Sequence, residues 1–332
     1  DSLPKVTAFH TQLGADERLF AKYKAVAASP SSARLPAARK KALANALRDF
    51  VLSGAELQGA AKQRFAAIQE RSAELSQKFS EHVLDATDGF VHYASADQLG
   101  GVPADVLQAT RAAAQAEGQD GHKLTLHQPV YQPVMQYATD RELRATLYKA
   151  YVTRASELGP PEQDNTPLMR ELIALRQEAA QLLGHATYAD VSLVPKMAEP
   201  PADVLAFLRE LAVKSKPSAE RDMAELREFA VSQGLTLLEP WDIGWASEKL
   251  KQARHGFSDE EVRQYFPEDK VLSGLFRVVE TIYGVHIRES KAETWHPSVR
   301  FFDIADRAGA TVAQFYFDNY ARRYTDLPLL VM

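Results

Sequence analysis

The sequence predicts a mainly α-helical protein of long antiparallel helices, with a small antiparallel β-hairpin near its end. Two observations lead to this fold class. Over residues 35–57 and 65–84, apolar side chains recur three and four positions apart, as they do on one face of a helix. Over residues 295–318 the apolar period shortens to about two, as in half-buried strands, and the polar residues 305–309 suit a hairpin loop.

The first half of the chain predicts helices separated by one irregular region. Gly54 and Gly59 lie between the first two helices and favour a short turn, so we expect these helices to form an α-hairpin. Residues 85–103 lose the helical period, which indicates a loop with a short strand at 90–94. Residues 122–138 contain two prolines and are expected to be extended, with helix resuming at Asp140.

The second half contains further helix signals. Thr166 is a suitable N-cap for a helix that follows it. A long helix over 201–234 contains Pro217, which we expect to kink or break it, because proline removes a hydrogen bond. Ser258 and Glu261 have the spacing of a capping box, so another helix should begin at Ser258.

The predicted hairpin bears on the organisation of the whole chain. Two strands alone are marginally stable in water, so a further strand should continue the sheet. Residues 327–332 are either that strand or sequence unrelated to the sheet. The proline-rich segment 158–166 is the best candidate for a domain boundary. We therefore expect a helical region with the α-hairpin at 1–160 and a second helical region at 161–332, which ends in the β-hairpin at 295–318.

Composition excludes several classes of function. The 332 residues are 45% apolar and 25% charged, which is ordinary for a globular protein. A net charge of −5 provides no excess of positive potential for nucleic acid, and no apolar run approaches the roughly 20 residues that cross a bilayer. The absence of cysteine excludes disulfides and thiolate chemistry and favours the cytoplasm.

The residues show no catalytic or metal-binding set of their own. A zinc-binding helix would place two histidines four apart, with glutamate after the first. None of the nine histidines is followed by glutamate, and no two are four apart. A nucleophile elbow, a phosphate-binding loop and a dinucleotide fingerprint are also missing from the sequence.

Several stretches, taken in order, resemble one peptidase family. They are NALRDFVLSG (45–54), HVLDATDGF (82–90), YKAYVTRASELGP (148–160), LRQEAAQLLG (175–184), SLVPKMAE (192–199), YFPEDKVLSGLFRVVETIYGV (265–285), WHPSVRFFDI (295–304) and FYFDNYARR (315–323). Together they are similar to the N-terminal and middle parts of the thimet oligopeptidase and neurolysin family of zinc metallopeptidases, most closely its bacterial oligopeptidase A branch.

The resemblance implies a fold and an activity. Members of the family are mostly helical, and their two lobes enclose a narrow channel that admits short peptides. Zinc is held by two histidines of an H-E-x-x-H helix and by a later glutamate, and the glutamate within the motif activates a zinc-bound water. This sequence contains no H-E-x-x-H motif. We therefore expect no zinc on this chain and no catalysis by it alone, although the full-length family enzyme uses zinc.

The resemblance also places the hairpin in a small sheet beside the zinc helix, where a sheet edge can pair with an extended peptide. Candidate substrate contacts are Phe315, Tyr316, Asp318 and Arg322. We expect a monomeric, cytoplasmic chain whose partners are short peptides. The alternative hypothesis is a naturally shortened, noncatalytic protein that binds peptides or serves as a helical scaffold.

Overall fold

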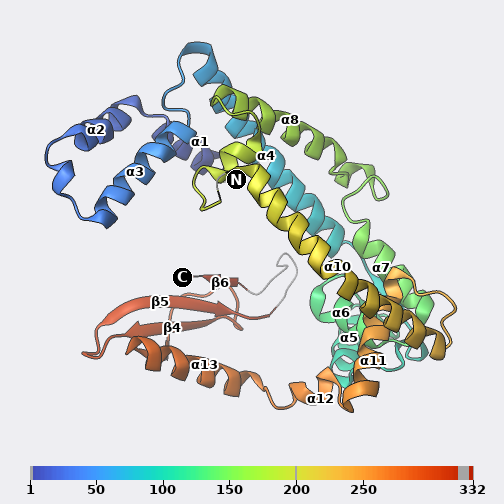
Figure 1. The fold of residues 1–332 in the computed structure, drawn as a ribbon. Coiled ribbons are helices and arrows are strands. Elements are labelled where there is room, and N and C mark those ends of the chain that lie inside the picture. Colours follow the sequence, from blue (N-terminus) through green and yellow to red (C-terminus); the bar gives the residue numbers. More distant parts are fainter. Residues whose placement is uncertain (1–2, 199, 321–328, 332) are drawn as a thin grey trace. The chain divides into compact units, whose positions relative to one another are not determined.

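The computed structural model describes residues 3–198, 200–320 and 329–331, and it confirms the predicted fold class. Contacts group the chain into two compact units (Figure 1). Unit 1 contains residues 1–83 and 155–221, and unit 2 contains residues 84–154 and 222–332. Each unit is thus built from two separate stretches of chain. The predicted division into two domains at residue 160 stays a prediction.

Unit 1 is helical throughout its described part. Its elements are α1 (Leu3–Gly14), α2 (Glu17–Ala28), the 3₁₀ helix η1 (Ser32–Arg34), α3 (Ala37–Leu52), most of α4 (Gly59–Asp88), η3 (Pro161–Gln163), α8 (Thr166–Leu182), α9 (Tyr188–Leu193) and the first part of α10 (Pro201–Ser232).

The core of unit 1 forms where α4 packs against α8, and Figure 1 shows the two helices side by side. The buried residues of this core are Phe65, Ile68, Leu75, Leu168, Leu172, Leu175 and Ala179. Ion pairs flank it: Arg64 Nε lies 2.6 Å from Glu178, and Arg71 Nε lies 2.6 Å from Glu171. As the residue number rises in α4 it falls in α8, so the two helices are antiparallel.

Helix α3 has a packing partner that the sequence did not predict. Both helices of the predicted α-hairpin exist, but α3 packs against α2, where Phe50 contacts the rings of Phe20 and Tyr23 at centroid distances of 5.4 and 5.3 Å. The core partner of α4 is α8. A helix from a distant stretch of chain thus covers the apolar face of α4, and the predicted α-hairpin of α3 with α4 stays a prediction.

Unit 2 combines helices with two small sheets. Its elements are the end of α4, β1 (His92–Ala94), η2 (Asp97–Leu99), α5 (Ala104–Ala116), β2 (His122–Leu124), α6 (Gln128–Tyr137), α7 (Arg141–Val152), the end of α10, η4 (Pro240–Asp242), α11 (Ile243–His255), α12 (Asp259–Arg263), α13 (Glu268–Tyr283), β3 (His286–Ser290), β4 (Arg300–Ala305), β5 (Thr311–Asp318) and β6 (Leu329–Val331).

The β-hairpin prediction is confirmed and extended. Strands β4 and β5 are antiparallel neighbours in a sheet of order β3-β4-β5-β6. The short strand predicted at 90–94 is also present and pairs with β2. Of the undecided residues 327–332, Leu329–Val331 pair with β5, while 327, 328 and 332 lie outside the described part.

Two predictions about proline need correction. Residues 128–137 form a helix, α6, although we expected extended chain. Pro129 lies in the first turn, where the N–H groups have no helical partner in any case, so only Pro133 removes a bond. Helix α10 likewise continues through Pro217, so the expected break does not occur, while the alternative of a kink stays a prediction. A long helix tolerates one missing bond when the residues on either side remain helical.

The predicted helix starts are accurate to within one residue. Asp140 caps α7 by accepting a hydrogen bond from the N–H of Leu143, and Ser258 caps α12 by accepting one from the N–H of Glu261. Thr166 is the first residue of α8, and Asn165 takes the cap position. The side chain of Asn165 is instead bonded to His82 at 2.9 Å and to the carbonyl of Phe79 at 3.0 Å.

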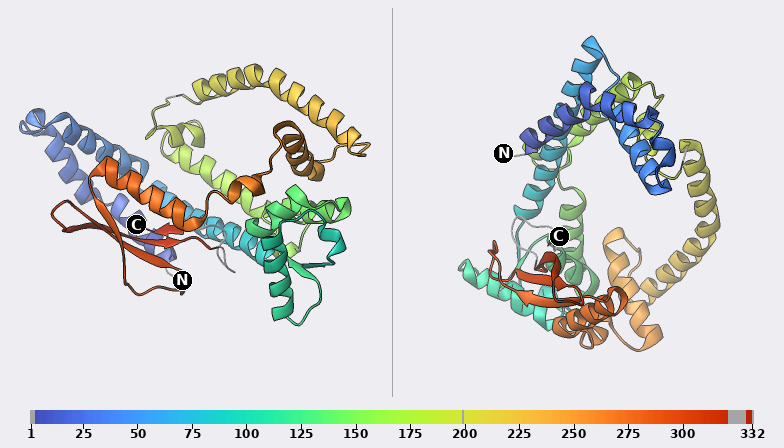
Figure 2. Two further views of the ribbon diagram at one scale, coloured as in Figure 1. Left: turned by 90° about the horizontal axis from the view of Figure 1, so that it is seen from below. Right: turned by 90° about the vertical axis from the view of Figure 1, so that its left-hand side faces the viewer.

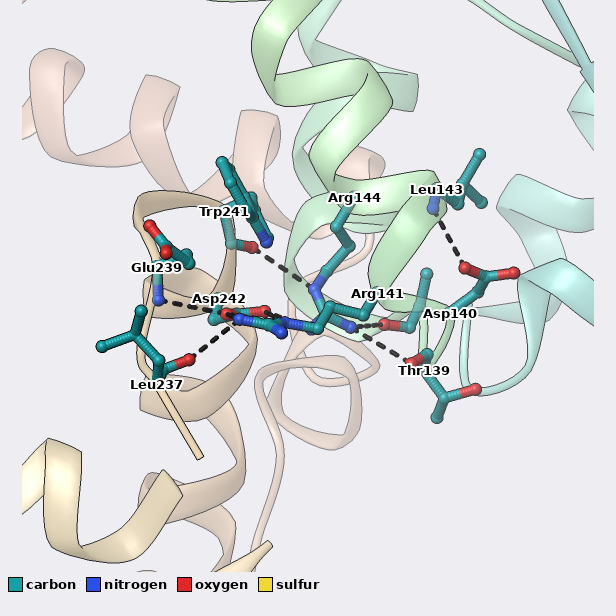
Figure 3. Close-up of polar contacts among 10 residues, drawn as sticks. Thr139, Asp140, Arg141, Leu143, Arg144, Leu237, Glu239, Trp241 and Asp242 are labelled. Carbon is teal, nitrogen blue, oxygen red and sulfur yellow. Dashed lines mark hydrogen bonds and ion pairs between the residues drawn. The ribbon is translucent and has the colours of Figure 1, made fainter. Parts of the chain in front are cut away.

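The two stretches of unit 2 meet at a buried carboxylate (Figure 3). Asp242 is 0% exposed and accepts hydrogen bonds from Arg144 at 2.7 Å, from Arg141 at 2.8 Å and from the main-chain N–H of Glu239 at 3.1 Å. Arg144 is 1% exposed, donates to the carbonyl of Ala138 at 2.6 Å, and lies over the ring of Trp245. Each buried charge therefore has opposite charge or polar partners around it.

Burial disfavours the charged form of Asp242, but hydrogen bonds from Arg141 and Arg144 outweigh it and hold its pKa below the ordinary value of 3.8. A carboxylate whose pKa is lowered by folding stabilises the folded state at neutral pH. That contribution is lost only as the pH falls through the folded-state pKa.

We predict that Asp242→Asn lowers the free energy of unfolding at neutral pH by about 3–5 kcal/mol, because it leaves the buried guanidinium of Arg144 without its counter-charge. Urea denaturation measures this. The matched control is Glu225→Gln, which removes an exposed ion pair with Arg254 in the same unit and should cost far less. Equal losses in the free energy of unfolding for the two variants would contradict the stabilising role assigned to Asp242.

Candidate functional site

The sheet that contains the predicted site residues has one face covered by helix α13. In Figures 1 and 2, α13 runs along the sheet formed by β4 and β5. Phe276 of α13 packs edge-on against Phe302 at 5.0 Å and against Phe315 at 6.2 Å, measured between ring centroids. Phe302 and Phe315 stack at 5.2 Å, and Phe302 is 2% exposed. These phenylalanines fix the helix on the sheet.

The opposite face carries an aromatic and acidic group that we call the aromatic face: Trp295, Phe301, Tyr316 and Asp318. Tyr316 and Phe301 are cross-strand partners with ring centroids 4.7 Å apart, and Trp295 lies 5.1 Å from Tyr316. The indole Nε1 of Trp295 donates a 3.0 Å hydrogen bond to Asp318, which is 5% exposed. Because side chains alternate along a strand, Tyr316 and Asp318 share this face.

The structure separates the four predicted site residues. Phe315 belongs to the face covered by α13. Tyr316 is half-buried on the aromatic face, and the described residues provide no hydrogen-bond partner for its hydroxyl. Asp318 is buried against Trp295. Arg322 lies outside the described residues. Tyr316 and Asp318 are therefore brought together, whereas Phe315 points to the other side of the sheet.

A polar contact ties the end of β5 to the beginning of α13. Glu268, the first residue of α13, accepts hydrogen bonds from the hydroxyl of Tyr320 at 2.6 Å and from the side-chain amide of Asn319 at 3.2 Å. The bond from Tyr320 is the main cause of the lowered pKa of Glu268, and it also raises the pKa of Tyr320. The sequence did not predict this contact, because about fifty residues separate its partners and no local pattern links them.

Part of the outer edge of β5 carries no strand in the described part of the chain. Strand β6 pairs with residues 316–318 of β5, whereas residues 311–315 pair only with β4. The side chains at 311–314 are exposed. An edge of this kind presents main-chain N–H and C=O groups that can pair with another extended chain.

The residues that the structure describes do not form a zinc site. Among the described residues, no group of three or more His, Asp or Glu side chains could hold a metal ion. His82 is bonded to Asn165 and His122 to Thr110, so these two buried imidazoles have structural partners. Within the same described residues, no helix has the length and apolar character of a membrane span.

The described fold is that of a mainly helical protein with a small aromatic sheet, the architecture that the sequence resemblance associates with channel-type peptidases. Comparison with known proteins agrees. The model of peptidase family M3 matches residues 134–324, which is more than half of the chain. The chain belongs to peptidase family M3.

Several relatives of this chain are oligopeptidase A proteins. Oligopeptidase A of Salmonella typhimurium is 44% identical over 328 residues, which cover 97% of this chain and 48% of the relative. Oligopeptidase A of Haemophilus influenzae is 43% identical over 327 residues, again 97% of this chain and 48% of the relative. The organellar oligopeptidase A of Arabidopsis thaliana is 35% identical over 337 residues, or 97% of this chain and 42% of that protein. The chain spans about half the length of these curated relatives.

We predict that Glu268→Gln returns the pKa of Tyr320 toward the ordinary value of 10.0, because an amide does not stabilise the protonated phenol as a carboxylate does. A residue-resolved NMR titration measures the change. Tyr93 is the internal control: its hydroxyl bonds Glu117 at 2.6 Å, which likewise raises its pKa, and its titration should not move. If Tyr320 titrates identically in both proteins, the contact is absent in solution.

Proposed function

We propose that this chain provides the helical walls and the beginning of the sheet of a zinc-dependent oligopeptidase of the oligopeptidase A type, whose full-length form hydrolyses short peptides in the cytoplasm. The observation that carries the proposal is the identity of 43–44% with bacterial oligopeptidase A across 97% of this chain. The covered face of the sheet and its open edge are compatible with a wall beside a peptide channel.

We also propose that the polypeptide of residues 1–332 does not hydrolyse peptides by itself. Neither an H-E-x-x-H motif nor any histidine pair four residues apart occurs in its sequence. In this proposal the zinc of the full-length enzyme is held by residues outside this sequence. The role of this chain is to position peptides, for which we expect a monomer to suffice.

The test is an assay of the purified chain with zinc and an internally quenched fluorescent peptide. We expect neither turnover nor retention of one zinc per chain after gel filtration, the latter measured by atomic absorption. Turnover with stoichiometric zinc would overturn the proposal. Specific binding of peptides by a chain that never cleaves them, even when it is joined to the second half of an oligopeptidase A relative, would favour a noncatalytic peptide-binding protein.

Within this proposal, the predicted substrate contacts fall into two roles. Tyr316 is the best candidate for direct contact, because its hydroxyl lies on the aromatic face without a partner among the described residues. Asp318 is better suited to hold Trp295 in place, since its carboxylate accepts the indole N–H. Phe315 would support the strand through its packing on α13, and Arg322 remains a predicted contact.

We predict that Tyr316→Phe weakens binding of a capped, uncharged hexapeptide by roughly twofold to tenfold, the effect of losing one hydrogen bond while the ring packing is kept. Fluorescence anisotropy with a labelled peptide measures the affinity. Tyr265→Phe removes a hydroxyl from an exposed ring elsewhere in unit 2 and should leave the affinity unchanged. Equal affinities for the wild-type chain and Tyr316→Phe would remove Tyr316 from the binding site.

A further inference from the structure

Helix α6 contains a short sequence repeat, and its helical conformation arranges the repeated side chains in rows along the helix. The segment QPVYQPVMQ (128–136) repeats Gln, Pro and Val every four residues. Residues four apart lie one above another on a helix, so Gln128, Gln132 and Gln136 form one row. We call this row the glutamine row. Val134 lies two residues from Gln132 and Gln136, on the opposite side of the helix, and is 0% exposed, which places the glutamine row on the outer side.

The glutamine row borders two hollows within unit 2. The first has a volume of about 510 Å³, lies between α5 and α6, and is also lined by Arg263 of α12. The second, of about 330 Å³, lies between α6 and α11. Gln132 and Gln136 line both hollows, and Gln128 lines the first. The row is thus a rim that the two hollows share, and we refer to the two hollows together as the depression.

The polar groups at this rim resemble those of a peptide main chain. The amide nitrogen of Gln128 donates to the hydroxyl of Tyr151 at 2.8 Å, which orients that amide. The side chain of Gln132 is exposed and has no hydrogen-bond partner among the described residues. Pro133 has no N–H, so the carbonyl of Pro129, four residues earlier, lacks its usual helical donor. Primary amides and a main-chain carbonyl can together donate to and accept from a peptide.

The charges around the depression are paired. Arg263 lies 2.8 Å from Asp105 at one end, and Lys251 lies 2.7 Å from Glu248 at the other. Glu248 also accepts a 3.0 Å hydrogen bond from the amide of Gln136. A depression with paired charges and apolar walls does not select a phosphate or another ion. It suits a neutral ligand that has many hydrogen-bonding groups.

The spacing of the row matches an extended chain. Four residues of an α-helix advance about 6 Å, and two residues of a strand advance roughly 6.4–6.8 Å. Successive glutamines therefore meet successive peptide groups on the same edge of an extended peptide. We propose that the glutamine row and the carbonyl of Pro129 bind the main chain of an extended peptide, with little selectivity for its side chains. This inference rests on the proposed function only for the class of ligand.

The test measures binding of two labelled peptides by fluorescence anisotropy, using the whole chain. One is a capped hexapeptide of alanine, threonine and valine, and the other is the same peptide N-methylated at every second residue, which removes the donors along one edge. We expect the methylated peptide to bind about tenfold more weakly. We also expect Gln132→Met, which keeps the side-chain length but removes the amide, to weaken binding of the unmodified peptide about tenfold.

Gln115→Met is the matched control, because Gln115 is exposed on α5 of the same unit and lines neither hollow. It should bind both peptides as the wild-type chain does. The inference is overturned if the wild-type chain binds no peptide at millimolar concentration, if Gln132→Met binds as well as Gln115→Met, or if N-methylation has no effect. The last comparison uses only the wild-type chain, so a lack of effect overturns the inference even if a variant fails to fold, while Gln132→Met distinguishes the glutamine row from the open edge of β5.

The result is separable from that of the proposed function. If the chain neither cleaves nor binds the peptides, the glutamine row and the predicted Tyr316 contact are refuted, while the proposed membership of this chain in a zinc-dependent oligopeptidase stands. If the chain cleaves peptide with bound zinc, the proposed function fails whatever happens at α6.

Discussion

The fold of unit 2 depends on a buried carboxylate between two arginines. Asp242 comes from the later of the two stretches of chain that form the unit, and Arg141 and Arg144 come from the earlier one. A charge at 0% exposure is stable only when opposite charge and hydrogen-bond donors replace the water that it has lost. The requirement is reciprocal, since Arg144 is equally buried. Neither stretch can therefore bury its half of this contact without the other.

The contact of Asp242 with Arg141 and Arg144 also helps to position surfaces that we propose to bind peptides. Arg144 also donates to the carbonyl of Ala138, just beyond the end of α6, so the buried contact helps to set the position of that helix. Glu248 of α11 accepts a hydrogen bond from Gln136 of α6, which helps to place α11 along the other side of the depression. The sheet is positioned by different means, namely the phenylalanines under α13 and the contact between Glu268 and Tyr320. Apolar packing against α13 positions one face of the sheet, and the hydrogen bond between Glu268 and Tyr320 positions the end of β5.

This chain has the mainly helical fold that the family resemblance implies, but its sequence lacks the zinc-binding histidine spacing that the same resemblance implies. The sequence contains no pair of histidines with zinc-binding spacing, and its buried imidazoles at His82 and His122 are bonded to Asn165 and Thr110. The described residues present a strand edge at residues 311–315 and a helix face with a row of glutamine side-chain amides. In our proposals, both surfaces would bind peptides through the peptide main chain.

The sequence by itself determined the helices with clear caps, the two strands of the hairpin and the family, because each depends on residues close together in the chain. Asp140, Ser258 and the alternation in 311–318 act within a few positions. Only the tertiary structure decided that α4 packs on α8, that 128–137 is helical despite two prolines, and that Asp318 is bound to Trp295 while Phe315 faces α13. These outcomes depend on burial against partners distant in sequence, and burial energy is settled only when the chain has folded.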